Sequence, residues 1–177
     1  MIASRFRAIP FTASLIIVVF SWIATGAAQA AALPQMNVAQ VVIFKEKREL
    51  HLLDKEGKIL KTYLVALGPN PIGPKEKRGD GRTPEGKYII DWRNPESRFH
   101  RSLHISYPNA KDKSQAQKMG VDPGGDIMIH GLPNGMENIG ATHREVDWTA
   151  GCIAVTNEEI EEIWKAVADG THAEIFP

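Results

Sequence analysis

Cys152 is the only cysteine of the chain and lies in the segment DWTAGCI, residues 147–153. A thiol attacks a carbonyl carbon as the thiolate, and an ordinary thiol with a pKa of about 8.5 is mostly protonated at neutral pH. It therefore needs a neighbouring base, and histidine suits this role because its ordinary pKa is about 6.5. Among six histidines, His130 stands directly before Gly131 at the end of a short apolar segment, where catalytic side chains are often mounted. The pattern predicts acyl transfer with Cys152 as the nucleophile and His130 as its base.

The residues beside this pair support the prediction. Gly131 and Gly151 have no Cβ, which lets backbone or substrate approach closely. The amides of Gly151 and Cys152 are therefore candidate donors to the oxyanion that forms during acyl transfer. Thr149 is a candidate orienting residue, although a threonine at this place also serves simply to satisfy a turn.

A structural interpretation of the cysteine stays open beside the catalytic one. Free cysteines are often buried and act as small apolar residues. One cysteine also cannot close an internal disulfide, so a thiol in an exported chain needs another reason to be there. The combination of Cys152 with His130 and two flanking glycines favours chemistry over packing.

Residues 1–30 are typical of an export signal. Arg5 and Arg7 give a positive start, residues 15–20 form an apolar run, and the segment ends in small residues suited to signal-peptidase cleavage. We expect the protein to be exported to the periplasm or cell envelope. The alternative is an uncleaved membrane anchor over residues 8–28.

The rest of the chain is predicted to form one domain over residues 38–177. A 177-residue chain that is 43% hydrophobic can bury a single core. Its 21 basic and 21 acidic residues cancel, and no long basic run is present to follow a phosphate backbone. Nucleic acid is therefore not an expected partner.

The elements that must position the candidate residues are mostly strands. Alternating and β-branched runs separated by turn signals predict strands at 40–44, 49–54, 59–67, 87–92, 102–106, 126–130 and 171–176. A short polar helix is predicted at 109–119. A second helix should begin after Thr156, which forms a capping-box pattern with Glu159, and should end near Gly170. The predicted fold class is mainly β (α+β), with a few short helices.

The segment 68–86 is rich in glycine and proline with interspersed charges. Such a composition cannot supply a regular ladder of backbone donors, so we expect a loop rather than a strand. The loop is either a lid that faces the substrate or a solvated crossover.

Three motifs together resemble the YkuD-type L,D-transpeptidase catalytic domain. They are the IHG segment at 129–131, Cys152 in TAGCI at 149–153 and GDGRTPEG at 79–86, and 152 − 130 = 22 positions separate histidine and cysteine. The resemblance covers about residues 38–177 and implies a YkuD-like arrangement of β-sandwich or mixed sheets. Two positions depart from the commoner family motif, since Ala150 stands where a histidine is usual and Ala154 where an arginine is usual.

The resemblance implies an enzyme of cell-wall biogenesis and cell shape. Cys152 would attack the carbonyl of a meso-diaminopimelate or similar residue in a peptidoglycan stem peptide and release the terminal D-residue. Arg82, Arg144 and Trp148 are candidate substrate contacts, the arginines as replacements for the missing cation. Neither a metal nor an organic cofactor is implied.

Two alternatives remain. The first is hydrolysis at the same site, by an L,D-carboxypeptidase, an endopeptidase or an amidase, including cleavage of the attachment of a wall-bound lipoprotein. The second is a non-catalytic module that binds the wall, suggested by Ala150 and Ala154.

Overall fold

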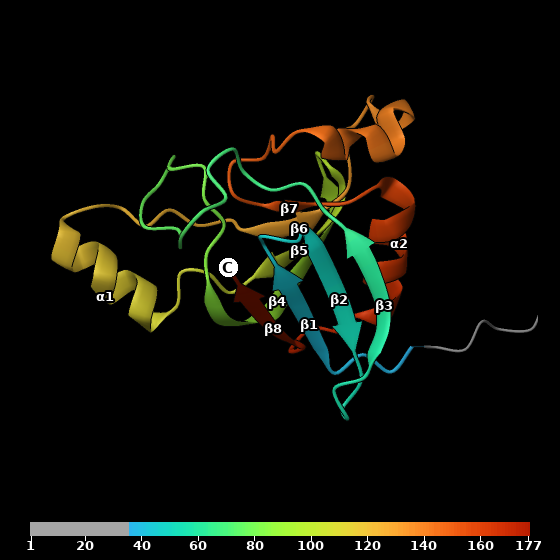
Figure 1. The fold of residues 1–177 in the computed structure, drawn as a ribbon, viewed down its shortest axis with the longest axis horizontal. Helices are drawn as coiled ribbons and strands as arrows, with labels where there is room; N and C mark the ends of the chain where they lie inside the picture. Colours follow the sequence, from blue (N-terminus) through green and yellow to red (C-terminus); the bar gives the residue numbers. More distant parts are fainter. Residues whose placement is uncertain (1–35) are drawn as a thin grey trace, which may run out of the picture. The chain divides into compact units, whose positions relative to one another are not determined.

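The computed structural model describes residues 36–177, so the predicted export signal at 1–30 lies outside the described residues. The described strands are β1 (Gln40–Phe44), β2 (Glu49–Leu53), β3 (Ile59–Leu64), β4 (Gly86–Ser97), β5 (His100–Ile105), β6 (Met128–His130), β7 (Ile153–Ala154) and β8 (His172–Phe176). The described helices are α1 (Ala110–Met119), the 3-10 helix η1 (Glu137–Glu145) and α2 (Asn157–Ala166). The prediction of a mainly β fold with short helices is confirmed (Figure 1).

The strands form one hydrogen-bonded series in the order β3-β2-β1-β8-β4-β5-β6-β7. The predicted meander is confirmed, because β1, β2 and β3 pair antiparallel in succession. Strand β8 then inserts beside β1 and pairs with it in parallel, so the C-terminal segment closes the sheet between β1 and β4 (Figure 1). Two parallel pairs, β1–β8 and β6–β7, make the sheet mixed.

The long strand β4 joins the two halves of the sheet. Its first part, from Gly86 to Ile89, pairs with β8, and its later part, from Ile90 to Ser97, pairs with β5. The register shifts after Ile90, which indicates a bulge at Asp91. The strand is longer than the predicted 87–92, because the sequence beyond residue 92 lacks the apolar alternation by which strands are recognised.

Helix α2 covers one face of the β4–β7 half. It begins at the predicted capping box, in which Thr156 and Glu159 satisfy each other's backbone N–H groups. Its residues Ile160 and Ile163 are fully buried in the core. The helix ends at Ala166 rather than near Gly170, because Val167 already has extended backbone. None of the helices in the described part is long and apolar enough to cross a membrane.

The loop at 68–86 is ordered and is held by a buried lysine. Lys45 donates from Nζ to the carbonyl oxygens of Gly73 at 2.6 Å and Thr83 at 3.1 Å. The same ammonium group forms an ion pair with Glu85 at 2.7 Å. Because Lys45 lies on the neighbouring turn after β1, these bonds fasten the loop to the sheet. The prediction of an irregular segment without strands is confirmed for residues 68–85, and Gly86 already begins β4.

Candidate active site

The candidate nucleophile and base project from the same face of two adjacent strands. Strands β6 and β7 run parallel, with Ile129 beside Ile153 and His130 beside Ala154. Ile129 and Ile153 are both fully buried in the core. Since side chains alternate between the two faces of a sheet, His130 lies on the opposite face, and so does Cys152, directly before Ile153. The Met128 amide donates to the Cys152 sulfur at 3.4 Å, which fixes the cysteine beside β6.

Cys152 lies where two hollows adjoin. One, of about 310 Å³, is lined by both Cys152 and His130 and extends toward the turn between β4 and β5. The other, of about 220 Å³, contains Cys152 but not His130 and is lined by Lys75 and Arg78. Cys152 therefore borders one hollow on the histidine side and another on a basic side.

The tautomer of His130 follows from its hydrogen bond. Its Nδ1 lies 2.7 Å from the carbonyl oxygen of Gly131, which can only accept, so Nδ1 carries the proton. Nε2 is then the nitrogen that can accept a proton from a thiol. The ring is held between Phe99, with centroids 4.5 Å apart, and Trp148, with centroids 5.7 Å apart.

Burial disfavours the charged form of both candidate groups. His130 is only 3% exposed, and loss of hydration lowers the pKa of its imidazole to about 4, despite the opposing bond to the Gly131 carbonyl. The same cause raises the pKa of the Cys152 thiol, although the Met128 amide opposes the rise. Consistent with a protonated thiol, the Cys152 sulfur donates to the Asp126 carbonyl at 3.4 Å.

Thr149 shapes the turn that presents the cysteine. Its hydroxyl donates to the Cys152 carbonyl at 2.8 Å and accepts from the Gly151 amide at 3.1 Å. Its own amide donates to the Leu67 carbonyl at 2.9 Å, which ties the turn to the segment after β3. The Gly151 amide, one of the two predicted oxyanion donors, is therefore already engaged inside the turn.

Both glycines beside the reactive pair occupy places where a side chain would collide. Gly151 has a φ of +119°, and a Cβ there would lie 2.3 Å from the carbonyl oxygen of Arg82. A Cβ on Gly131 would lie 2.6 Å from the Asn157 side-chain oxygen. That oxygen accepts from the Leu132 amide at 2.8 Å, which fastens the chain just after His130. The predicted need for close backbone approach therefore has a structural basis at both positions.

A match to a protein-family model identifies the family of the chain. A family model described as the L,D-transpeptidase catalytic domain, YkuD, matches residues 39–175. The chain belongs to this family.

Individual relatives agree with this assignment. The chain is 34% identical over 134 residues to the protein YafK of Escherichia coli strain K12, with 72% of this chain and 46% of YafK covered. Among solved structures, the helical cell shape determining protein Pgp2 of Campylobacter jejuni has 28% identity and a TM-score of 0.60, with 79% and 48% of the two chains covered. An L,D-transpeptidase from Mycobacterium smegmatis has 12% identity and a TM-score of 0.51, with 80% and 59% covered, and shares the fold. The chain thus spans about half the length of YafK and of Pgp2.

The candidate substrate residues of this L,D-transpeptidase family member lie in different places. Trp148 packs edge-on against the His130 ring, next to the reactive pair. The Arg82 guanidinium turns away to Glu76, at 3.2 Å, and only its backbone reaches the cysteine turn. Arg144 forms an ion pair with Glu159 in the cap of α2. Neither guanidinium lines the two hollows that contain Cys152.

Sequence reasoning missed the cations that do line those hollows. Arg98 lies on the histidine side, and Lys75 and Arg78 lie on the other side. Lys75 is buried and bonds to Asp80 at 2.8 Å, and its positive charge favours the Cys152 thiolate slightly. No motif marks these residues, because they reach the site through loops whose paths depend on tertiary contacts.

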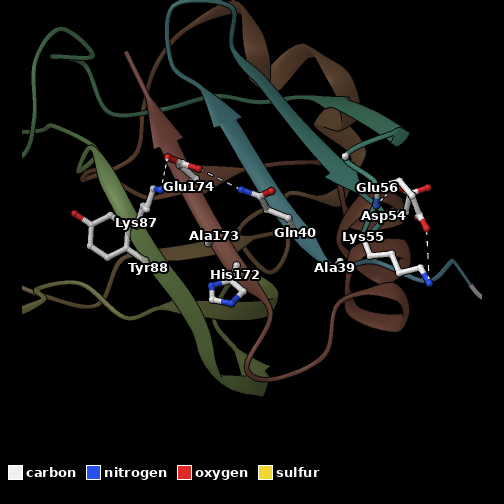
Figure 2. Close-up of a pocket in the computed structure, with 11 residues that line it drawn as sticks. Ala39, Gln40, Asp54, Lys55, Glu56, Lys87, Tyr88, His172, Ala173 and Glu174 are labelled. Carbon is white, nitrogen blue, oxygen red and sulfur yellow. Dashed lines mark hydrogen bonds and ion pairs between the residues drawn. The ribbon is translucent and has the colours of Figure 1, made fainter.

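A larger hollow of about 600 Å³ lies elsewhere, over β1, β8 and the start of β4. Figure 2 shows Glu174 between Gln40 and Lys87, and the carboxylate bonds Gln40 at 3.3 Å and pairs with Lys87 at 3.8 Å. Neither Cys152 nor His130 lines this hollow. Its central carboxylate already has two partners, and the residues of the three sequence motifs do not line it.

Proposed function

We propose that the protein transfers acyl groups between peptidoglycan stem peptides, with Cys152 as the nucleophile and His130 as the general base. The observation that carries the proposal is the tautomer of His130. Its Nδ1 proton is committed to the Gly131 carbonyl, while its ring and the Cys152 thiol line one hollow. An accepting Nε2 that lines the same hollow as a thiol supports a role for His130 as the base that activates Cys152.

The reaction balances with these two residues. As Sγ of Cys152 attacks the carbonyl carbon of the L-centre, Nε2 of His130 takes the thiol proton. The bond from that carbon to the nitrogen of the terminal D-residue breaks, and His130 returns the proton to the leaving amine. The amine of an acceptor peptide then attacks the thioester and gives its proton to His130. The carbon–sulfur bond breaks, and His130 returns that proton to the sulfur, which restores the thiol. We assign the oxyanion to the Cys152 amide, because the Gly151 amide is engaged with Thr149.

The proposed substrate is a stem peptide in the cell envelope, cleaved after a meso-diaminopimelate or similar residue. A role in cell shape is proposed from the likeness to Pgp2, whose description names that role. Binding of a substrate carboxylate by Arg82 or Arg144 stays a prediction. Arg98, Lys75 and Arg78 are the cations that face the hollows around Cys152.

Mass spectrometry of muropeptides after incubation with the purified protein tests the proposal. Crosslinked dimers or exchanged D-amino acids are expected from the wild type and should be absent with Cys152→Ala and strongly reduced with His130→Asn. His172→Asn is a matched control, because His172 is exposed on β8 away from the cysteine. Trimmed monomers would instead assign hydrolysis to the same thiol. An unchanged substrate, with no acylation of Cys152 by a carbapenem, would refute catalysis and favour a wall-binding module.

A further inference from the structure

Trp92 presents an aromatic face to solvent on β4. Its side chain is 41% exposed, and its ring stacks on His104, with centroids 5.1 Å apart and planes 21° apart. His104 is in turn held by Asp91, whose carboxylate lies 2.5 Å from Nδ1. Single exposed apolar residues are common and need no explanation. A large exposed ring that rests on a second ring, itself held by a carboxylate, is a more specific feature.

This ring lies in the same cross-strand row as the reactive cysteine. Trp92 pairs with His104 between β4 and β5, and His104 pairs with Met128 between β5 and β6. Met128 is joined to Cys152 through its amide. Directly paired residues project from the same face of a sheet, so Trp92 and Cys152 lie at the two ends of one row. Asn94, two residues after Trp92, and Met128 both line the hollow that contains Cys152, so the row borders the cleft.

The length of the row matches the length of a stem peptide. From β7 to β4 the row crosses three strand spacings of about 4.8 Å, or about 14 Å. In a stem peptide, the third residue carries the carbonyl that Cys152 would attack, and a lactyl ether joins the first residue to the sugar. Three residues and a lactyl group of similar length span about 13–14 Å when extended. A peptide acylated at Cys152 and extended along this row would place its sugar near Trp92.

Resting on the proposed function, we infer that Trp92 is a platform for a sugar ring of the glycan strand to which the stem peptide is attached. The electron-rich face of an indole attracts the partly positive C–H face of a pyranose. The Asp91 carboxylate beside it is an acceptor for sugar hydroxyl groups. The platform would let the enzyme distinguish a peptide on its glycan from a free peptide.

The test compares two substrates, a disaccharide-tetrapeptide and the free tetrapeptide of the same sequence. The measured quantity is the ratio of their kcat/KM values for release of the terminal D-residue, in the wild type, Trp92→Ala, Trp92→Phe and Leu64→Ala. Leu64 is the matched control, because it is 51% exposed but lies on β3 at the far edge of the sheet. We expect the wild type to prefer the disaccharide substrate. Trp92→Ala should lower the ratio by about three- to tenfold, whereas Trp92→Phe should keep most of it.

The outcomes separate this inference from the function on which it rests. If the ratio of the two kcat/KM values is the same in the wild type and in folded Trp92→Ala, the platform is overturned. A ratio that falls equally in Leu64→Ala would overturn it too. Neither result would contradict acyl transfer at Cys152. If the wild type released no terminal residue from either substrate, the proposed function itself would fail. Circular dichroism of each variant establishes that the compared proteins are folded.

Discussion

The resting state of the reactive pair yields a prediction about pH. The pKa of His130 is lowered to about 4, and the pKa of the Cys152 thiol is raised. Even an ordinary thiol pKa of about 8.5 lies about 4.5 pH units above that of this imidazole, so moving the proton from sulfur to nitrogen costs more than about 6 kcal/mol. Opposite unit charges formed at about 4 Å from each other would return about 4 kcal/mol at an effective dielectric constant near 20. The remaining cost of more than about 2 kcal/mol leaves roughly a few thiolates in a hundred molecules or fewer.

Two measurements test this. The ultraviolet difference spectrum between wild type and Cys152→Ala should show no thiolate absorbance at pH 7. The profile of kcat/KM, which reports on the free enzyme, should stay level as the pH falls and drop only near pH 4, because only below that pH does the imidazole lose its accepting nitrogen. Thiolate absorbance that persists at pH 5, or an acid limb near the ordinary histidine pKa of about 6.5, would show that a preformed ion pair operates instead.

Two further predictions concern the frame of the site. Gly151→Ala should lower the free energy of unfolding by about 1–3 kcal/mol from its φ of +119° alone. The new Cβ would also collide with the Arg82 carbonyl, and acylation of Cys152 should be lost. Gly135→Ala, with a φ of +87° and open space around it, is the control, and equal losses of stability and acylation in both variants would contradict the collision. Lys45→Met should lower the free energy of urea unfolding by about 3 kcal/mol, because it leaves Glu85 and two loop carbonyls without their donor. Lys55→Met, which removes an exposed pair, should cost less than about 1 kcal/mol, and a similar loss in both would contradict the anchoring role of Lys45.

Much of the fold could be predicted because its strands carry local patterns. The meander of β1–β3 and the capped helix α2 follow from alternation and from the Thr156–Glu159 pair. Strand β7 is only two residues long, too short for any periodicity, and η1 has no side-chain cap at its start. The pairing of β8 with β1 joins the two ends of the domain, and no local pattern encodes such a contact.

The site shows the same division. The motifs around His130 and Cys152 indicate the reactive pair, because glycine flanks and residue types are visible in the sequence. The direction in which an arginine side chain points cannot be predicted from such motifs. Arg82 was predicted to contact the substrate, but it is its carbonyl that meets the Gly151 turn, while the guanidinium binds Glu76. Closeness to a motif in sequence specifies the backbone path and leaves the direction of a long side chain undetermined.

The parallel pairing of β6 and β7 links the topology of the fold to its chemistry. Parallel neighbours cannot be joined by a tight turn, so the chain must leave β6 and return over a crossover, here residues 131–152. That crossover carries Trp148, which packs against His130. It also carries Asp147, which accepts from the Leu67 amide at 2.9 Å and pairs with Arg48 at 2.7 Å. The connection that brings Cys152 alongside β6 thus also carries one of the two aromatic rings that cover the His130 imidazole, so the route of the chain contributes to the low pKa of His130.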